Sequence, residues 1–333
     1  MSLDETSRKP HDRLAQWLAS DMEGVNTLIR ERMASEHAPR IPEVTAHLVE
    51  AGGKRLRPML TLAAARLCGY DGPYHVHLAA TVEFIHTATL LHDDVVDESA
   101  QRRGRPTANL LWDNKSSVLV GDYLFSRSFQ LMVETGSIRV LDILANASAT
   151  IAEGEVLQLT AARDLGTTEG TYHKVIRGKT AALFSAATEV GGVIAKAPED
   201  QVRALFTYGD ALGIAFQIVD DLLDYGGATQ VIGKNVGDDF REGKLTLPVI
   251  KAVAKADAEE RAFWKRVIEK LDQRDGDLEH ALSLLARHGT LEETRSEALA
   301  WSRKAKDALK LLPPHELRDM LSDLADFVVA RVS

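Results

Sequence analysis

Apolar residues recur three or four positions apart along most of the chain, which is the spacing of one face of an α-helix. Pro313-Pro314 marks a helix break close to the C-terminus. The segment after this break places its apolar residues on one helical stripe, formed by Leu317, Met320, Leu321, Leu324, Phe327 and Val328. Strict alternation of apolar and polar residues, the pattern of a half-buried strand, is hard to find. The pattern therefore predicts helices joined by short turns.

Glycine, proline and capping residues indicate where these helices end. Gly289 predicts a helix C-terminus, and Thr290 with Glu293 predicts a capping box at the start of the next helix. Other turns are expected at the punctuation points Gly72-Pro73, Gly166, Gly191-Gly192 and Gly226-Gly227. No Ser/Gly/Pro-rich linker and no repeat of fixed period divides the chain. We therefore expect one all-α domain over residues 1–333, with about the first ten residues loosely held.

Charge and cysteine content narrow the functional class. The 333 residues carry 49 acidic and 40 basic side chains, a formal charge of −9 with neutral histidines. This balance argues against a general nucleic-acid binder, which needs a net basic surface. Cys68 is the only cysteine, so we expect no internal disulfide and a reducing, cytoplasmic setting. No apolar run reaches the roughly 18 residues needed to span a bilayer, which predicts at most peripheral membrane contact.

Two aspartate clusters are the strongest chemical signal. Each follows a long apolar helical segment, and the two clusters are DDVVD, with Asp93, Asp94 and Asp97, and DDLLD, with Asp220, Asp221 and Asp224. On a helix the first and last aspartates of each cluster point the same way. Carboxylates held that close repel one another unless a cation lies between them, and hard oxygen ligands suit Mg²⁺. A single cluster could equally be an acidic helix end, but two such clusters favour a site where bridging metals hold a polyanion.

Basic residues adjacent to glycines form a second signal. They lie in short islands that comprise Lys54, Arg55, Arg57, Arg102, Arg103, Arg105, Lys179, Lys234 and Lys244. Each island alone is ordinary solvated surface charge. Cations on turns, combined with metal-binding carboxylates, are what a diphosphate site would contain.

These motifs resemble the trans-type isoprenyl diphosphate synthases, the polyprenyl synthetase family, and within it the long-chain octaprenyl and decaprenyl synthases. Five ordered blocks carry the resemblance from about Arg40 onward: GGKRLRP at Gly52 to Pro58, EFIHTATLLHDDVVDESAQRRGRPTAN at Glu83 to Asn109, GKTAALF at Gly178 to Phe184, FQIVDDLLDY at Phe216 to Tyr225, and GKNVGDDFREGKLTLP at Gly233 to Pro248. The resemblance implies a helical bundle around a central active-site cavity and a homodimer. It also implies condensation of isopentenyl diphosphate onto farnesyl or geranyl diphosphate, which gives octaprenyl to decaprenyl chains for quinones.

The resemblance also implies roles for individual residues. Mg²⁺, with about three ions per site, would be bound by Asp93, Asp97, Asp220 and Asp224. The implied catalytic set adds Asp94, Asp221, Lys179 and Lys234. The allylic diphosphate would be held by Arg102, Lys179, Thr180, Gln217, Lys234 and Lys244. Isopentenyl diphosphate would be held by Lys54, Arg57, His86 and Arg103. His86 alone would read as a core histidine, but its spacing of seven residues before Asp93 favours a ligand contact.

Small residues before the first aspartate bear on product length. A growing hydrocarbon needs an apolar tunnel, and bulky side chains just before Asp93 would block it. Ala88 and Thr89 lie at this point, with Ile85 upstream, which predicts an open tunnel and a long product. The tunnel floor could be formed by Phe129, Leu131, Met132 and Val133, although an apolar stripe is more often ordinary core.

Other functions remain open at this point. A shorter-chain synthase making farnesyl or geranylgeranyl diphosphate would share these motifs. A terpene cyclase is disfavoured because the second motif is aspartate-rich, and a non-catalytic partner subunit is disfavoured because both motifs are present. A helical HD-type metal phosphohydrolase is suggested by His92-Asp93 with His75, His77 and His86 nearby, but it would leave DDLLD unexplained.

Overall fold

The computed structural model describes residues 9–50, 52–226 and 237–332. The chain is folded into two compact units. The first comprises Met1–Ser148, Leu183–Gly209 and Ala308–Leu321, and the second comprises Ala149–Ala182, Asp210–Asp307 and Ser322–Ser333. Helices α8 (Ile138–Ala161), α11 (Glu199–Gly226) and α17 (Glu316–Ala330) contribute residues to both units. The expectation of one domain over the whole chain stays a prediction.

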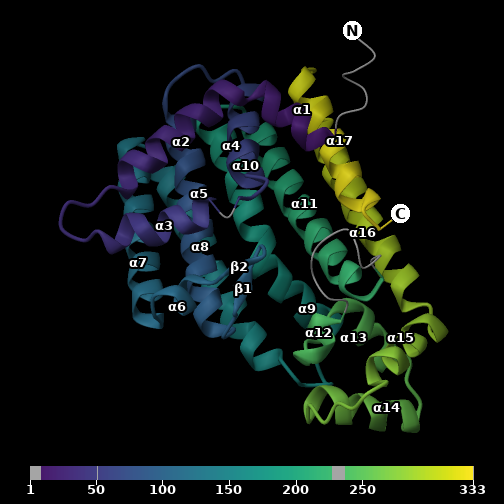
Figure 1. The fold of residues 1–333 in the computed structure, drawn as a ribbon. Helices are drawn as coiled ribbons and strands as arrows, with labels where there is room; N and C mark the ends of the chain where they lie inside the picture. Colours follow the sequence, from purple (N-terminus) through teal and green to yellow (C-terminus); the bar gives the residue numbers. More distant parts are fainter. Residues whose placement is uncertain (1–8, 51, 227–236, 333) are drawn as a thin grey trace. The chain divides into compact units, whose positions relative to one another are not determined.

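The first unit consists of helices packed around α5 (Tyr74–Val96), which lies beside α7 (Asn114–Glu134) along much of its length (Figure 1). Its other helices are α1 (Pro10–Trp17), α2 (Ala19–Met33), α3 (Arg40–Glu50), α4 (Leu56–Leu67), α6 (Ala108–Leu111) and most of α10 (Ala182–Ile194). About half of α5 is buried, including Leu78, Phe84 and Leu91. This explains why its sequence is apolar on several faces and not on one stripe.

A small hairpin follows α5. Strands β1 (Gln101–Arg102) and β2 (Arg105–Pro106) pair antiparallel, with Gln101 opposite Pro106. Gly104 has a φ of 75° at the turn, a conformation that glycine adopts without strain. The expected all-α fold is confirmed, because these two-residue strands are the only ones in the described part of the chain.

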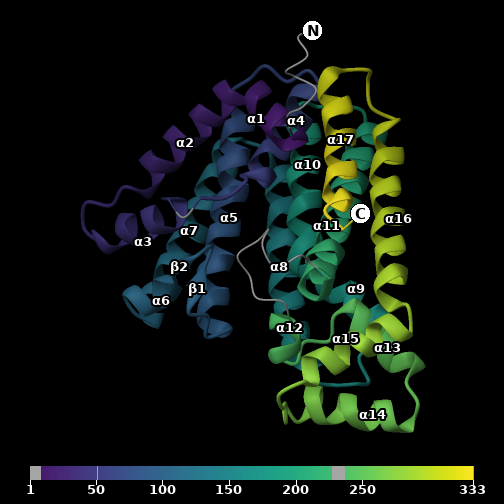
Figure 2. The same ribbon diagram turned by 45° about the vertical axis from the view of Figure 1, so that its right-hand side comes forward.

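The second unit combines the remaining helices with parts of the three shared ones (Figure 2). Its own elements are α9 (Glu169–Ile176), η2 (Arg177–Ala181), α12 (Asp238–Arg241), α13 (Leu247–Lys255), α14 (Ala258–Trp264), η3 (Lys265–Glu269), α15 (Asp277–Arg287) and nearly all of α16 (Thr290–Leu309). One apolar cluster of this unit is centred on Trp264, which is fully buried with Phe240, Val267 and Leu284.

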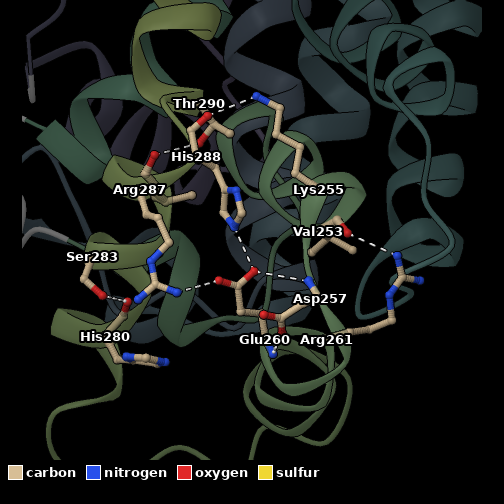
Figure 3. A network of polar contacts seen from close by, with 11 residues as sticks. Val253, Lys255, Asp257, Glu260, Arg261, His280, Ser283, Arg287, His288 and Thr290 are labelled. Carbon is tan, nitrogen blue, oxygen red and sulfur yellow. Dashed lines mark hydrogen bonds and ion pairs between the residues drawn. The ribbon is translucent and has the colours of Figure 1, made fainter.

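A polar network joins the ends of α14, α15 and α16 (Figure 3). Asp257 and Glu260 form a capping box at the start of α14. The buried Glu260 carboxylate also accepts hydrogen bonds from Arg287 and from His288, each at 2.8 Å. Lys255 donates to the backbone carbonyl of His288 at 3.0 Å. The Glu260 side chain therefore links the start of α14 to the end of α15.

Two sequence expectations about helix ends were wrong. Gly191 and Gly192 lie inside α10 and form no turn. A Cβ at Gly191 would come within 2.8 Å of the α4 backbone, so glycine at this position permits close packing of the two helices. The Thr290 hydroxyl lies 3.3 Å from the carbonyl oxygen of Leu285, to which it donates, while Glu293 pairs with Lys255. The capping box among these helices is the one at Asp257 and Glu260.

Helix α11 is, within the described residues, the one helix long and apolar enough to cross a membrane. Its most apolar window is 72% buried inside the protein, as expected for a core helix.

Candidate active site

The first acidic motif lies at the C-terminal end of α5. Asp93 and Asp94 occupy the last turn, and Asp97 is the C-cap residue, whose N–H donates to the carbonyl of Asp93 at 2.8 Å. Asp97 is exposed, Asp93 is half-buried and Asp94 is fully buried. The first and last carboxylates of this motif are therefore the ones within reach of a ligand.

Asp94 turns inward and holds the hairpin. Its Oδ1 atom accepts from Arg102 Nε at 2.9 Å and pairs with Nη2 of the same guanidinium at 2.7 Å. A buried carboxylate of this kind requires a bonded cation. Asp94 thus fixes the position of Arg102 on β1, and the predicted direct catalytic role of Asp94 stays a prediction.

The second acidic motif, on α11, also has accessible outer aspartates and a buried middle aspartate. Asp220 and Asp224 are half-buried, whereas Asp221 is buried. Tyr172 donates its hydroxyl to Asp221 at 2.6 Å, and the Gln217 side-chain amide donates to the other oxygen at 2.8 Å. Thr180 in turn donates its hydroxyl to Gln217 at 2.8 Å. Thr180 and Gln217 thus belong to a hydrogen-bond chain that ends on Asp221, and their predicted contact with a diphosphate stays a prediction.

Burial controls the protonation of this chain. It raises the pKa of Asp221 to about 8, with the nearby Asp239 carboxylate acting in the same direction. The hydrogen bonds from Tyr172 and Gln217 act against that rise by stabilising the carboxylate. Burial likewise raises the pKa of Tyr172 well above its ordinary value, so the phenol remains a donor.

Asp224 contacts the start of α12. Its carboxylate accepts backbone N–H bonds from Asp238 at 3.2 Å and Asp239 at 3.0 Å, where α12 begins. Lys244, just after α12, pairs with Glu242 at 2.5 Å and lies 3.9 Å from Asp239. Lys234, also predicted for this site, lies outside the described residues.

Lys179 and Thr180 lie on η2, a single turn of π-helix. Irregular turns of this kind are frequent at functional sites. Gly154 of α8 permits the close approach of this turn, because a Cβ there would lie 2.8 Å from the backbone nitrogen of Lys179. The Lys179 ammonium donates to Glu155 at 3.0 Å.

The first unit contains a pocket of about 10 Å³, roughly the space of one water molecule, lined by charged side chains. Arg55, Arg102 and Arg103 line it together with Glu83 and His86. Glu83, whose side chain is 13% exposed, pairs with Arg55 at 2.9 Å. Three of the predicted isopentenyl diphosphate ligands therefore cluster here: Arg103 and His86 in the lining, and Arg57 against His86. Lys54, which directly precedes Arg55 in the sequence, is exposed.

Arg57 and His86 contact each other in this cluster. An Arg57 Nη1 atom lies 3.3 Å from His86 Nε2, and its guanidinium stacks 4.5 Å from the Phe184 ring centroid. Burial lowers the pKa of Arg57 to about 10, which leaves it charged at neutral pH. Burial and the surrounding arginines hold the pKa of His86 well below its ordinary value. Because arginine can only donate, His86 accepts at Nε2 as a neutral ring.

Two arginines of this pocket lie on a strained backbone. Arg55 and Arg103 have φ values of 47° and 53°, in the left-handed region that favours glycine. A Cβ on Gly53 would lie 2.7 Å from an Arg103 guanidinium nitrogen, so this glycine leaves room for that group. The glycine-rich GGKRLRP segment and the RRGRP hairpin thereby meet at one pocket.

The residues predicted to set product length lie on α5. Ala88 and Ile85 are fully buried, and the Thr89 hydroxyl donates to the carbonyl of His86 at 2.8 Å. Leu131 and Met132 of the predicted tunnel floor are buried in the core, whereas Phe129 and Val133 are 40% and 64% exposed on α7. The expectation of an internal floor does not fit Phe129 and Val133.

The histidines that suggested a phosphohydrolase are engaged separately. His92 lies 3.1 Å from the carbonyl oxygen of Val118, and His75 lies 3.0 Å from Asp21. His77 lies 3.3 Å from Glu134. Within residues 9–50, 52–226 and 237–332, no group of three or more His, Cys, Asp or Glu side chains is arranged to hold a metal. The contacts give the HD-type alternative no support.

Comparison with known proteins decides the family. Residues 38–285 match the family model described as polyprenyl synthetase. The chain belongs to this family. It is accordingly an enzyme of the prenyltransferase class.

Individual polyprenyl synthetases resemble the chain over almost its full length. Octaprenyl diphosphate synthase of Escherichia coli (strain K12) is 45% identical over 320 residues, which cover 96% of this chain and 98% of the relative. The crystal structure of a decaprenyl diphosphate synthase from Rhodobacter capsulatus is 79% identical, with a TM-score of 0.95 and coverage of 97% and 99%. A polyprenyl synthase from Caulobacter crescentus CB15, complexed with calcium and isoprenyl diphosphate, is 52% identical with a TM-score of 0.91, covering 97% of this chain and 99% of that one.

Two polar residues of this polyprenyl synthetase were missed from the sequence. Glu83 lies one helical turn before His86, a spacing that could have indicated a shared face, but an isolated glutamate carries no signal of burial. Tyr172 lies 49 positions from its partner Asp221, and no local pattern joins the two.

Proposed function

We propose that this polyprenyl synthetase condenses isopentenyl diphosphate units onto an allylic diphosphate, farnesyl or geranyl diphosphate, to make an octaprenyl to decaprenyl diphosphate for quinone side chains. The observation that carries the proposal is the pair of acidic helix motifs, each with accessible outer carboxylates and a buried middle aspartate that fixes neighbouring polar groups. The similarity to octaprenyl and decaprenyl diphosphate synthases supports the long product.

The metal of this reaction is proposed to be Mg²⁺, with about three ions per site. Asp93 and Asp97 from one motif, with Asp220 and Asp224 from the other, would hold it. The donor set fits, because these hard oxygen ligands leave room for water and substrate phosphate oxygens, which Mg²⁺ commonly retains. When bound, Mg²⁺ neutralises negative charge on the diphosphate.

The side chains that line the arginine pocket are proposed to bind isopentenyl diphosphate, and because the pocket of about 10 Å³ holds only about one water molecule, they must move apart to admit the diphosphate. Arg57 and Arg103 supply planar guanidinium donors suited to phosphate oxygens, and Lys54 adds an exposed charge from the segment before α4. The neutral His86 ring adds polarity without a further charge.

The allylic diphosphate is proposed to be bound by Arg102, Lys179, Thr180, Gln217, Lys234 and Lys244. Arg102 is held for this task by Asp94. The arginine and the three lysines of this set stabilise the negative charge that grows on the departing diphosphate, so the allylic C–O bond ionises. The alkene of isopentenyl diphosphate attacks the carbocation and forms a C–C bond. The new carbocation loses a proton from the adjacent carbon to the released diphosphate, which restores an alkene.

The molecule is further proposed to act as a cytoplasmic homodimer with at most peripheral membrane contact. Val118, Leu119, Phe129 and Val133 of α7 expose apolar side chains on one helical face. Exposed apolar patches of this kind commonly mark protein–protein interfaces. A second copy of α7 is the partner that this face suits.

Mass spectrometry of the dephosphorylated product tests the function. Purified protein with Mg²⁺, farnesyl diphosphate and isopentenyl diphosphate is expected to yield prenyl alcohols of eight to ten isoprene units, on the order of the relatives' products. Release of phosphate without chain growth would contradict the proposal. Products that stop at about four units would contradict its long-chain part.

A further inference from the structure

Glu83 is the only acidic side chain among the described residues that line the arginine pocket. It lies on α5, in the turn before His86, and its carboxylate is 2.9 Å from Arg55. Arg57 and Arg103 also act electrostatically on this carboxylate. Neither the proposed chemistry nor the binding of substrate uses Glu83 directly.

The charges in the pocket do not balance. The charge of Arg102 is matched by Asp94. Arg55, Arg57 and Arg103 remain, and they face the single carboxylate of Glu83. Buried like charges repel strongly, so an empty pocket without Glu83 would hold three guanidinium groups with no anion among them.

Resting on the proposed function, we infer that Glu83 is a positioning residue that acts as the internal counter-ion of the arginine pocket. It keeps the arginines in place while no diphosphate is bound, and its negative charge opposes the binding of an anion. The pocket therefore holds diphosphate less tightly than its arginines alone would allow. For a synthase that must load a new isopentenyl diphosphate in every cycle while inorganic pyrophosphate is released, this limits inhibition by the product.

Glu83→Gln separates the two effects, because glutamine keeps the shape and removes the charge. We expect a lower Tm without ligand and, by isothermal titration in EDTA, inorganic pyrophosphate bound about tenfold more tightly than by the wild type. Glu83→Asp, which keeps the charge, should bind pyrophosphate with nearly wild-type affinity. In turnover, Glu83→Gln should lower the KM for isopentenyl diphosphate without raising kcat.

Two further variants control the measurement. Glu83→Gln combined with Arg55→Met restores the net charge of the pocket, so its pyrophosphate affinity should return toward the wild-type value even if the single variant is poorly folded. Asp21→Asn breaks a different ion pair, with Arg66 at 2.7 Å, and should lower the Tm with pyrophosphate affinity unchanged. Arg103→Gln should weaken the titration and so assign it to this pocket.

Pyrophosphate bound equally or more weakly by Glu83→Gln would overturn the inference, as would no binding by the wild type. A merely structural role would lower the Tm and the affinity together. The titration involves no condensation, so it can succeed even if the chain-elongation assay fails. The two proposals are therefore judged separately.

Discussion

At the scale of single residues, the middle aspartate of each acidic motif fixes neighbouring side chains by hydrogen bonds. Asp94 bonds Arg102, and Asp221 accepts from Tyr172 and Gln217. The outer aspartates remain half-buried or exposed. If the outer aspartates contact the metal as proposed, this arrangement separates them from the buried aspartates that fix neighbouring groups, which is how a rigid site is preorganised.

Tyr172→Phe tests that separation. The change leaves one buried oxygen of Asp221 without its donor, and we expect a loss of about 1–3 kcal/mol of stability. Because Asp220 is adjacent to Asp221, the concentration of Mg²⁺ needed for half-maximal activity should rise several-fold. Tyr208→Phe is the matched control, since the buried Tyr208 hydroxyl, on α11 twelve residues before Asp220, donates to the carbonyl of Leu321 at 2.8 Å. Equal Mg²⁺ dependence in both variants would contradict the role of Tyr172.

Ala88→Phe tests the prediction that small residues before Asp93 permit a long product. Phenylalanine at this fully buried position would fill space on α5, and we expect products several isoprene units shorter, measured by mass spectrometry. Ala63→Phe on α4 overpacks an equally buried position and should lower the Tm without changing product length. Unchanged products from Ala88→Phe would remove this residue from length control.

At the scale of elements, the Glu260 carboxylate joins the start of α14 to the end of α15 by accepting hydrogen bonds from Asp257, Arg287 and His288 (Figure 3). The hydrogen bond from His288 is the main cause that holds the pKa of Glu260 below its ordinary value of 4.5. A carboxyl group with a lowered pKa stabilises the fold above its unfolded pKa and loses that contribution as pH falls through the folded value.

Glu260→Gln should therefore lower the Tm at neutral pH by several degrees. The difference from the wild type should be full above about pH 4.5 and should shrink as the pH falls further. Thermal unfolding followed by circular dichroism across this range measures it. A Tm difference that grows toward acid would show that another group dominates.

The helices were predictable because the signals that specify them lie within each segment of the sequence. Apolar spacing and proline positions indicated helices, and the C-terminal stripe that contains Leu321 and Leu324 became the buried face of α17. The roles of Gly191 and Thr290 were not predictable from local sequence. Gly191 packs against the distant helix α4, and the Thr290 hydroxyl donates to the carbonyl of Leu285 in the preceding helix. The same distinction holds for the candidate site: local motifs are enough to name Asp93 and Arg103 as candidates, whereas the pairing of Tyr172 with Asp221 required the fold.

At the scale of the whole molecule, the apolar face of α7 predicts self-association. Leu119 is 66% exposed, and a charge placed there would be buried in the proposed dimer. We expect Leu119→Glu to shift the protein from dimer to monomer in analytical ultracentrifugation. Leu311→Glu alters a similarly exposed leucine outside α7 and should leave the dimer intact. A monomeric wild type would contradict the proposed interface.

The proposed reaction requires the two acidic motifs to act on one substrate diphosphate. The most direct measurement is the condensation rate of Asp93→Asn, Asp220→Asn and the double variant, each folded as judged by Tm. If both carboxylates act on the same diphosphate, each single variant should lose most of its activity, and the double variant should be about as slow as the slower single one. Losses that multiply as independent effects, or a single variant with wild-type turnover, would contradict a shared site.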